Sequence, residues 1–340
     1  MERSIIQVGS SALAITLPAL WARMHGLKPR DKVEVEVMAD GSLRVTPQKK
    51  MGRGYLSRTI RVGVEMDRGS IVREVVASYL AGFARIKIEY SSQSYPKVKG
   101  LRRLLEEVML GLTLVDEGAG YMEFYVTVDP GSMDFWDAVS KAYHATLAML
   151  RDTIGAVERG DAETLESILE RDTLVDRLYL YSMRKMNMAL LGLEPFNSLG
   201  LSSLAEAPSM VMAVKSIERV ADHTTIIASN SLALLKKGRG MAPEVLDMVK
   251  EAFSAFETSG KALLGRSRRA AERVAEVIDR YPGKRFPSLS AGELEEALIL
   301  DSARRILGYS LDIAESVLDL ESVREAAKAS MQIDSGDQAR

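Results

Sequence analysis

Cysteine is absent from this chain, which excludes disulfide bridges, thiolate zinc sites, cysteine-ligated iron–sulfur clusters and cysteine nucleophiles. Histidine is scarce: there are 3 in 340 residues, and none follows a glutamate by three positions, as the di-iron enzymes of helical bundles require. No apolar run approaches the ~20 residues of a membrane span, and the first residues carry no signal-peptide pattern. We therefore expect a cytoplasmic protein.

Motifs of common enzyme classes are also missing. The sequence has no Gly-x-x-x-x-Gly-Lys-Ser/Thr loop for nucleotide phosphates, no Gly-x-Ser-x-Gly elbow, and no recognisable arrangement of serine, histidine and acid. We therefore predict that the protein is not an enzyme, with a metal-dependent hydrolase as the remaining enzymatic alternative.

The charge that is present is unevenly distributed. The whole chain carries a net charge of −2, but residues 1–53 hold nine Lys or Arg against five Asp or Glu, so this segment is +4 and the rest is −6. A basic module joined to an acidic body permits DNA contact at one end of the protein.

Residues 1–50 have the pattern of a small β-rich module. The dipeptide Asp40-Gly41 is typical of a hairpin turn, and Pro18 can open a short helix over residues 19–24 because its missing N–H costs nothing at a helix start. So few residues cannot bury an adequate core, and we expect pairing with a second copy. The strands are predicted at residues 4–8, 13–17, 32–37 and 42–46.

This module resembles the SpoVT/AbrB family in the run Gly9-Ser-Ser-Ala-Leu-Ala-Ile-Thr-Leu-Pro18 and in Trp21, Gly26-Leu27, Asp31-Lys-Val33 and Asp40-Gly-Ser-Leu43. The resemblance implies a swapped-hairpin homodimer, which in many members binds DNA. DNA-binding members carry arginines where this chain has Gln7 and Ala14, so dimerisation carries over more safely than DNA binding. The candidate DNA-binding residues are Arg3, Arg23, Lys28, Arg30, Lys32 and Arg44.

Residues 55–130, after a linker near residues 52–54, alternate between strand and helix patterns and predict a small α+β domain without a chemical motif. Its strands are expected at 59–64, 85–90 and 121–128, and its helices at 70–83 and 97–112.

Residues 131–330 predict an all-α domain. Its helices fall into two groups of three, about 131–238 and 241–322, as expected for an internal repeat of three-helix bundles. The predicted helices span residues 135–154, 162–190, 208–235, 243–264, 268–281 and 293–320. The fold class is therefore α+β and multidomain: a β module, a small α+β domain and a helical pair of bundles.

Two pairs of acids stand in apolar helix stripes. Asp172 and Asp176 lie one helical turn apart, as do Glu218 and Asp222. Four unpaired carboxylates in a bundle would each cost several kcal/mol, so a compensating cation is expected, and a multivalent metal with oxygen ligands is the natural candidate. On the pattern alone, a solvated acidic face with ion pairs to neighbouring basic residues is equally open. Those neighbours are Arg171, Arg177, Lys215 and Arg219.

The helical half resembles the PhoU family in Glu170-Arg-Asp-Thr-Leu-Val-Asp-Arg-Leu-Tyr179 and in Ser216-Ile-Glu-Arg-Val-Ala-Asp-His-Thr224. The resemblance implies a metal cluster, commonly iron or zinc, with Asp172, Asp176, Glu218 and Asp222 as ligands. An AbrB-like module before a PhoU-like bundle looks like the archaeal variant of these phosphate-uptake regulators.

The second repeat departs from this motif. Arg304 and Gly308 replace the two acids of one helix, and on the other only Asp279 remains, followed by the helix breaker Pro282. We therefore expect a metal cluster in the first repeat only, and expect Arg304 to meet a carboxylate or phosphate.

These features together predict a regulator of phosphate uptake that binds DNA and whose helical half senses metal, phosphate or a transporter partner. The alternative is a regulator that binds no DNA and restrains a phosphate transporter or its sensor kinase through protein contacts. In that case the N-terminal module would serve only to dimerise.

Overall fold

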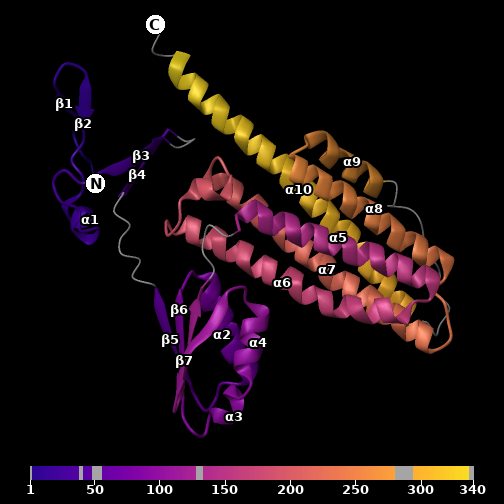
Figure 1. Ribbon diagram of the computed structural model, residues 1–340. Helices are drawn as coiled ribbons and strands as arrows, with labels where there is room; N and C mark the ends of the chain where they lie inside the picture. The colour runs from indigo at the N-terminus through magenta and orange to yellow at the C-terminus, as the bar shows by residue number, and fades with distance from the viewer. Residues whose placement is uncertain (1, 38–40, 48–55, 128–132, 280–293, 337–340) are drawn as a thin grey trace.

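The chain folds into a small N-terminal β region, a mixed sheet with helices, and a long helical bundle (Figure 1). The predicted α+β class with a helical bundle is confirmed. The computed structural model describes residues 2–37, 41–47, 56–127, 133–279 and 294–336.

The N-terminal region consists of two hairpins and one short helix. β1 (Ile6–Val8) pairs with β2 (Ala12–Ala14), and β3 (Val33–Val37) pairs with β4 (Leu43–Pro47), each as a separate two-stranded antiparallel sheet. Helix α1 (Ala19–Met24) follows Pro18, as predicted. Of the predicted turn, Gly41 has a left-handed φ of 78°, whereas Asp40 lies outside the described residues, as does the predicted linker at 52–54. Among the N-terminal residues whose burial is described, 2–35 and 41–47, none is buried.

The middle region is a four-stranded sheet in the order β5-β6-β8-β7, with β5 and β6 parallel and the other pairs antiparallel. One face packs on helices, where Ile86 of β6 is buried with Tyr79 and Phe124. Arg85 and Lys87, which alternate with Ile86 along β6, point to the opposite face. Its elements are β5 (Ser57–Val62), α2 (Arg68–Leu80), β6 (Arg85–Tyr90), α3 (Tyr95–Val98), α4 (Leu101–Val108), β7 (Leu112–Gly118) and β8 (Tyr121–Val126).

The predicted helix over residues 97–112 is wrong in two respects. Gly100 adopts a left-handed φ of 76° and divides it into α3 and α4. The helical pattern then ends at Val108, and Gly111, with φ 75°, turns the chain into β7, a strand that the sequence pattern did not reveal. Pairing with β8 holds Leu112 onward in the sheet, so tertiary contacts override the local pattern.

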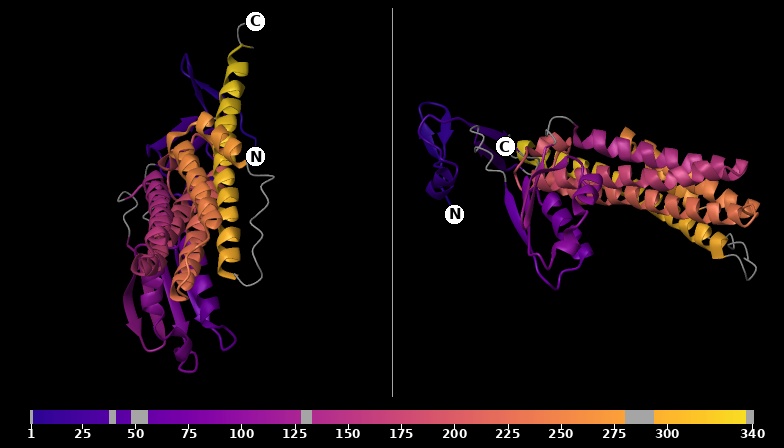
Figure 2. Two further views of the ribbon diagram at one scale, coloured as in Figure 1. Left: turned by 90° about the vertical axis from the view of Figure 1, so that its right-hand side faces the viewer. Right: turned by 60° about the horizontal axis from the view of Figure 1, so that its bottom comes forward.

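Helices dominate the rest of the chain. Helices α5, α6 and α7 pack on one another, α8, α9 and α10 do likewise, and α7 lies against α10 while α5 lies against α8. Figure 2 shows these helices running side by side along the length of the bundle. They are α5 (Phe135–Arg159), α6 (Ala162–Leu190), α7 (Ala207–Lys236), α8 (Pro243–Gly265), α9 (Arg268–Asp279) and α10 (Leu294–Gly336). Among the described residues, no helix combines the length and apolar character needed to cross a membrane.

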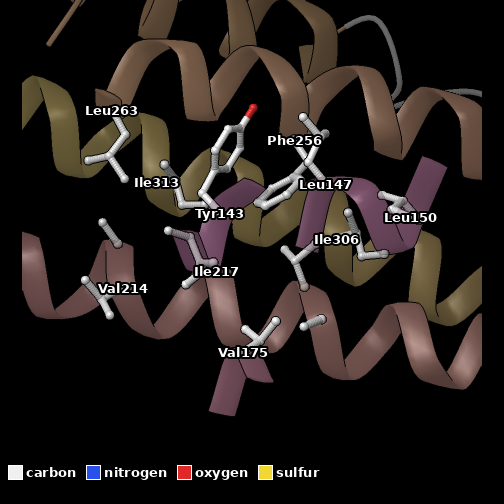
Figure 3. Packing of buried hydrophobic residues seen from close by; sticks show 14 of the residues in the cluster. Tyr143, Leu147, Leu150, Val175, Val214, Ile217, Phe256, Leu263, Ile306 and Ile313 are labelled. Carbon is white, nitrogen blue, oxygen red and sulfur yellow. The ribbon is translucent and has the colours of Figure 1, made fainter. Parts of the chain in front are cut away.

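The two halves of the bundle share one hydrophobic core. Figure 3 shows Tyr143 and Leu150 of α5, Phe256 of α8 and Ile306 of α10 converging with Val175 of α6. The Tyr143 ring lies so close to α8 that only a glycine fits opposite it, at position 260. The two groups of three helices are therefore halves of one packed unit.

Helix α6 also fixes the middle region to the bundle. The buried guanidinium of Arg184 donates to the carbonyl oxygens of Tyr79, Gly82 (3.2 Å) and Phe83 (3.0 Å), and Asn187 donates to that of Leu80 at 3.0 Å. These carbonyls lie at and just beyond the end of α2, where the regular hydrogen bonds of the helix stop. The middle sheet and its helices are thus held to the same helix that carries Asp172 and Asp176.

Candidate metal centre

The candidate centre lies where α6 and α7 run antiparallel beside each other. Helix α6 begins after Asp161, whose side chain accepts the Thr164 N–H at 3.0 Å. The register between α6 and α7 is visible at one end of the site, where the Lys215 ammonium lies 4.5 Å from the centre of the Tyr179 ring. Asp176 lies three residues before Tyr179 and Glu218 three residues after Lys215, so the acids of the two helices come opposite each other.

The structure brings together the four acids that the sequence singled out. Carboxylate oxygens of Asp172, Asp176 and Asp222 all lie within 4.8 Å of one another. Glu218 faces the same group, since its charge acts on each of the three aspartates. The aspartates are half-buried and Glu218 is only 8% exposed.

Burial and mutual repulsion raise the pKa of the three aspartate carboxyls. Burial raises the pKa of Asp172 to about 7, with further contributions from the charges of Asp176, Asp222 and Glu218. Burial likewise raises the pKa of Asp222 to about 6, helped by Glu218 and Asp176 and opposed by Lys215. The pKa of Asp176 is raised first by burial and then by Glu218. Without a cation, the cluster is therefore an unfavourable concentration of negative charge.

Two oxygen atoms of the cluster are buried without a hydrogen-bond partner. They are Asp172 Oδ1 and Glu218 Oε2. Buried acceptors left unpaired are costly and uncommon, so they indicate groups whose partner arrives with a ligand.

Most of the neighbouring basic residues point elsewhere. Arg171 pairs with Asp152 of α5, and the Arg219 guanidinium stacks over the Tyr309 ring at 5.4 Å. The Nε of Arg177 is buried without a hydrogen-bond partner. Within the described part of the chain, Lys215 alone forms an ion pair with the cluster, through Glu218 at 2.5 Å. The alternative prediction, in which each acid forms an ion pair with a neighbouring basic residue, therefore holds only for Glu218.

The predicted second repeat has a different arrangement. Arg304 of α10 is exposed and pairs with Asp301 at 3.0 Å, as expected for a cation that meets a carboxylate. Arg305 binds the same carboxylate at 2.8 Å. The side chain of Asp279 and all of Pro282 lie outside the described residues.

The candidate DNA-binding residues are spread over the N-terminal region. Arg3 precedes β1, Arg23 lies in α1, and Lys28, Arg30 and Lys32 lie in the segment before β3, all of them exposed. Arg44 lies in β4 and is half-buried. A single chain does not gather them on one element.

Sequence reasoning missed the roles of two basic residues. Arg184 is buried and faces the middle region, and the available signal was its charge among the methionines near the end of α6. Lys215 was noted only as a neighbour of Glu218, although Tyr179 opposite it is a natural partner for an ammonium.

Comparisons with known protein families place two regulatory domain types in the chain. Residues 139–231 match the model of the PhoU domain, and residues 6–53 match the model described as antidote-toxin recognition MazE, bacterial antitoxin. A search of curated proteins finds no match. The architecture of an AbrB-like module followed by a PhoU domain is therefore confirmed. The PhoU domain implies regulation of phosphate homeostasis, and the MazE/AbrB-like domain suggests DNA binding.

Proposed function

We propose that this protein is a non-enzymatic regulator of phosphate uptake whose PhoU-like bundle holds a metal ion or small metal cluster. The observation that carries the metal site is the acidic cluster within the matched PhoU domain, with its two buried, unpaired oxygens. Asp172, Asp176, Glu218 and Asp222 are the proposed ligands.

The donor set fits a multivalent cation. All four groups are carboxylates, which bind divalent and trivalent metals, and iron and zinc both accept such oxygens. The bound cation would supply positive charge to Asp172 and Asp222, whose pKa values are raised in its absence. It would also link α6 to α7, since each helix contributes two of the ligands.

Metal binding can be tested by isothermal titration calorimetry with Zn²⁺ and, without oxygen, Fe²⁺. We expect the double variant Asp172→Asn/Asp222→Asn to bind about 100-fold more weakly than the wild type, because two ionic ligands are lost. Glu170→Gln is the control, since that acid is exposed on the same helix. Equal binding by all three proteins, or none by the wild type, would overturn the metal site.

We also propose that the N-terminal region pairs with a second copy of the chain. Its large apolar residues are open to solvent in a single chain: Leu13 is 71% exposed and Ile5 is 68% exposed. Two separate two-stranded sheets are also too small to be stable alone. Interlocking with a second copy would cover the apolar residues and join the sheets.

In this proposal, the state of the bundle controls DNA affinity through the paired modules. A two-fold symmetric dimer reads two half-sites at a fixed separation, so a change in the spacing of its modules changes its affinity. The sensed signal is metal, phosphate or a transporter partner. The DNA-binding residues are the six basic residues named for this region.

DNA binding can be tested by fluorescence anisotropy across a salt series, with DNA from upstream of a phosphate-transport operon and a shuffled control. We expect a sequence preference with a negative slope of log affinity against log salt. Arg23→Ala should weaken binding and make the slope of log affinity against log salt less negative by about 1. Lys141→Ala, an exposed charge on α5, should change neither.

A second candidate is favoured by Gln7 and Ala14, which pair across the first hairpin with Leu13 and Ile6 where DNA-binding relatives carry arginines. Here the protein would restrain a phosphate transporter or its sensor kinase by direct contact, and the N-terminal region would only dimerise. The absence of DNA binding at low salt would favour this candidate.

A further inference from the structure

Lys215 occupies a special position at the rim of the acidic cluster. Its ammonium binds Glu218 Oε1 at 2.5 Å and lies 4.5 Å from the centre of the Tyr179 ring, so it joins α7 to α6. The side chain is 32% exposed, whereas that of Glu218 is 11% exposed. The lysine side chain is thus more open to solvent than the carboxylate that it binds.

Glu218 differs from the three aspartates in the partners of its carboxylate oxygens. Carboxylate oxygens of the aspartates already lie within 4.8 Å of one another, as ligands of one ion would. Glu218 has one oxygen bound to Lys215 and the other buried and unpaired. Lys215 therefore occupies Oε1 of this carboxylate, and Oε2 is available to bind a ligand.

We propose that Lys215 is a built-in counter-cation that competes with metal for Glu218, so that metal binding displaces the ammonium from the carboxylate. This inference rests on the proposed metal site. Lys215 remains protonated throughout: one cation replaces another, and no bond other than the ion pair is broken.

The physical reason lies in the charge of the cluster. Without metal, Lys215 offsets part of the repulsion among four acids, and its charge opposes the raised pKa of Asp176 and Asp222. With metal bound, an ammonium in the same place would repel the ion. The Tyr179 ring gives the displaced ammonium a second partner, because an aromatic face attracts a cation. The Lys215–Glu218 ion pair therefore favours ions that bind the acids strongly enough to displace the ammonium over weakly binding or singly charged ions.

The first test compares the Zn²⁺ affinity of three proteins by calorimetry at fixed pH. Lys215→Met keeps most of the side-chain length without the charge, and we expect its dissociation constant to fall about tenfold, which corresponds to about 1.4 kcal/mol. Lys215→Arg retains a cation and should stay near the wild type. Lys236→Met is the matched control, since Lys236 also joins α7 to α6, through Glu166 at 3.1 Å, but lies outside the cluster.

The second test is thermal unfolding with EDTA and with Zn²⁺. In EDTA we expect Lys215→Met to have a lower Tm than the wild type, because the acids lose their counter-cation. In saturating Zn²⁺ the order should reverse. A residue that is only structural would lower the Tm in both conditions.

The outcomes separate the two proposals. If the wild type binds Zn²⁺ and Lys215→Met binds it equally or more weakly, Lys215 does not compete and only this inference is overturned. If neither protein binds Zn²⁺ while both fold, the metal site itself is wrong. Should Lys215→Met and Lys236→Met tighten binding alike, the effect is general electrostatics, and the specific competition for Glu218 is rejected.

Discussion

Replacing Asp172 by asparagine should make the metal-free protein more stable, and the gain should depend on pH. The folded carboxyl holds its proton up to about pH 7, whereas the unfolded one loses it near its ordinary value of 3.8. Between these values the folded state binds more protons than the unfolded state, so the free energy of unfolding falls as the pH rises. Asparagine has almost the same shape and removes this charge.

The magnitude follows from the size of the pKa difference. A rise from 3.8 to about 7 corresponds to about 4 kcal/mol against the ionised form. Asp172 keeps partial contact with solvent and shares the repulsion with Asp176 and Asp222, so we reduce this to about 2 kcal/mol. We expect Asp172→Asn to raise the free energy of unfolding by about 2 kcal/mol at pH 8 and by almost nothing at pH 4.

Urea unfolding in EDTA at several pH values provides the assay. Trp136 packs against the bundle core and can report its unfolding in a Trp21→Phe background. Glu170→Gln is again the control and should be pH-independent relative to the wild type. A stability of Asp172→Asn equal to or below the wild type at pH 8, or a gain that does not shrink toward pH 4, would refute the reasoning.

Three further predictions concern other parts of the molecule. Arg184→Ala should lower the free energy of unfolding by about 3 kcal/mol, because buried carbonyls after α2 lose a charged donor. Hydrogen exchange should increase in that segment first, and unchanged exchange there would contradict the prediction. Gly260→Ala should lower the free energy of unfolding by about 2 kcal/mol, because its Cβ would lie 1.9 Å from the Tyr143 ring. A second substitution, Tyr143→Leu, should partly restore the Tm measured by calorimetry, and an unchanged Tm in Gly260→Ala would contradict the close packing. Leu13→Asp should halve the molar mass measured by light scattering without lowering the helical content; an unchanged mass would argue against pairing through the first hairpin.

The helical half was the most predictable part of the fold. Its long apolar stripes indicate helices over many turns, and the predicted helix 162–190 coincides with α6. By contrast, β7 could not be found in this way, because Leu112 and the residues after it become a strand only through pairing with β8. Short elements depend on partners that are distant in sequence.

The candidate site was predictable in its members and not in its internal contacts. Spacing by one turn in an apolar stripe singles out Asp172 and Asp176, and likewise Glu218 and Asp222. That the two pairs meet depends on the register between α6 and α7, which local patterns do not encode. For the same reason, the sequence could not distinguish Lys215, which binds the cluster, from Arg171, which turns toward α5.

The common core of the bundle has a consequence for how the protein could be shortened. The matched PhoU segment ends at residue 231, so residues 139–231 invite excision as a minimal metal-binding fragment. Helices α8 and α10, however, supply Phe256, Ile306 and Ile313 to the same core, and removing them would strip the inner faces of α5 and α7. The matched segment is thus not a separate folding unit, because α8 and α10 complete the hydrophobic core around α5 and α7.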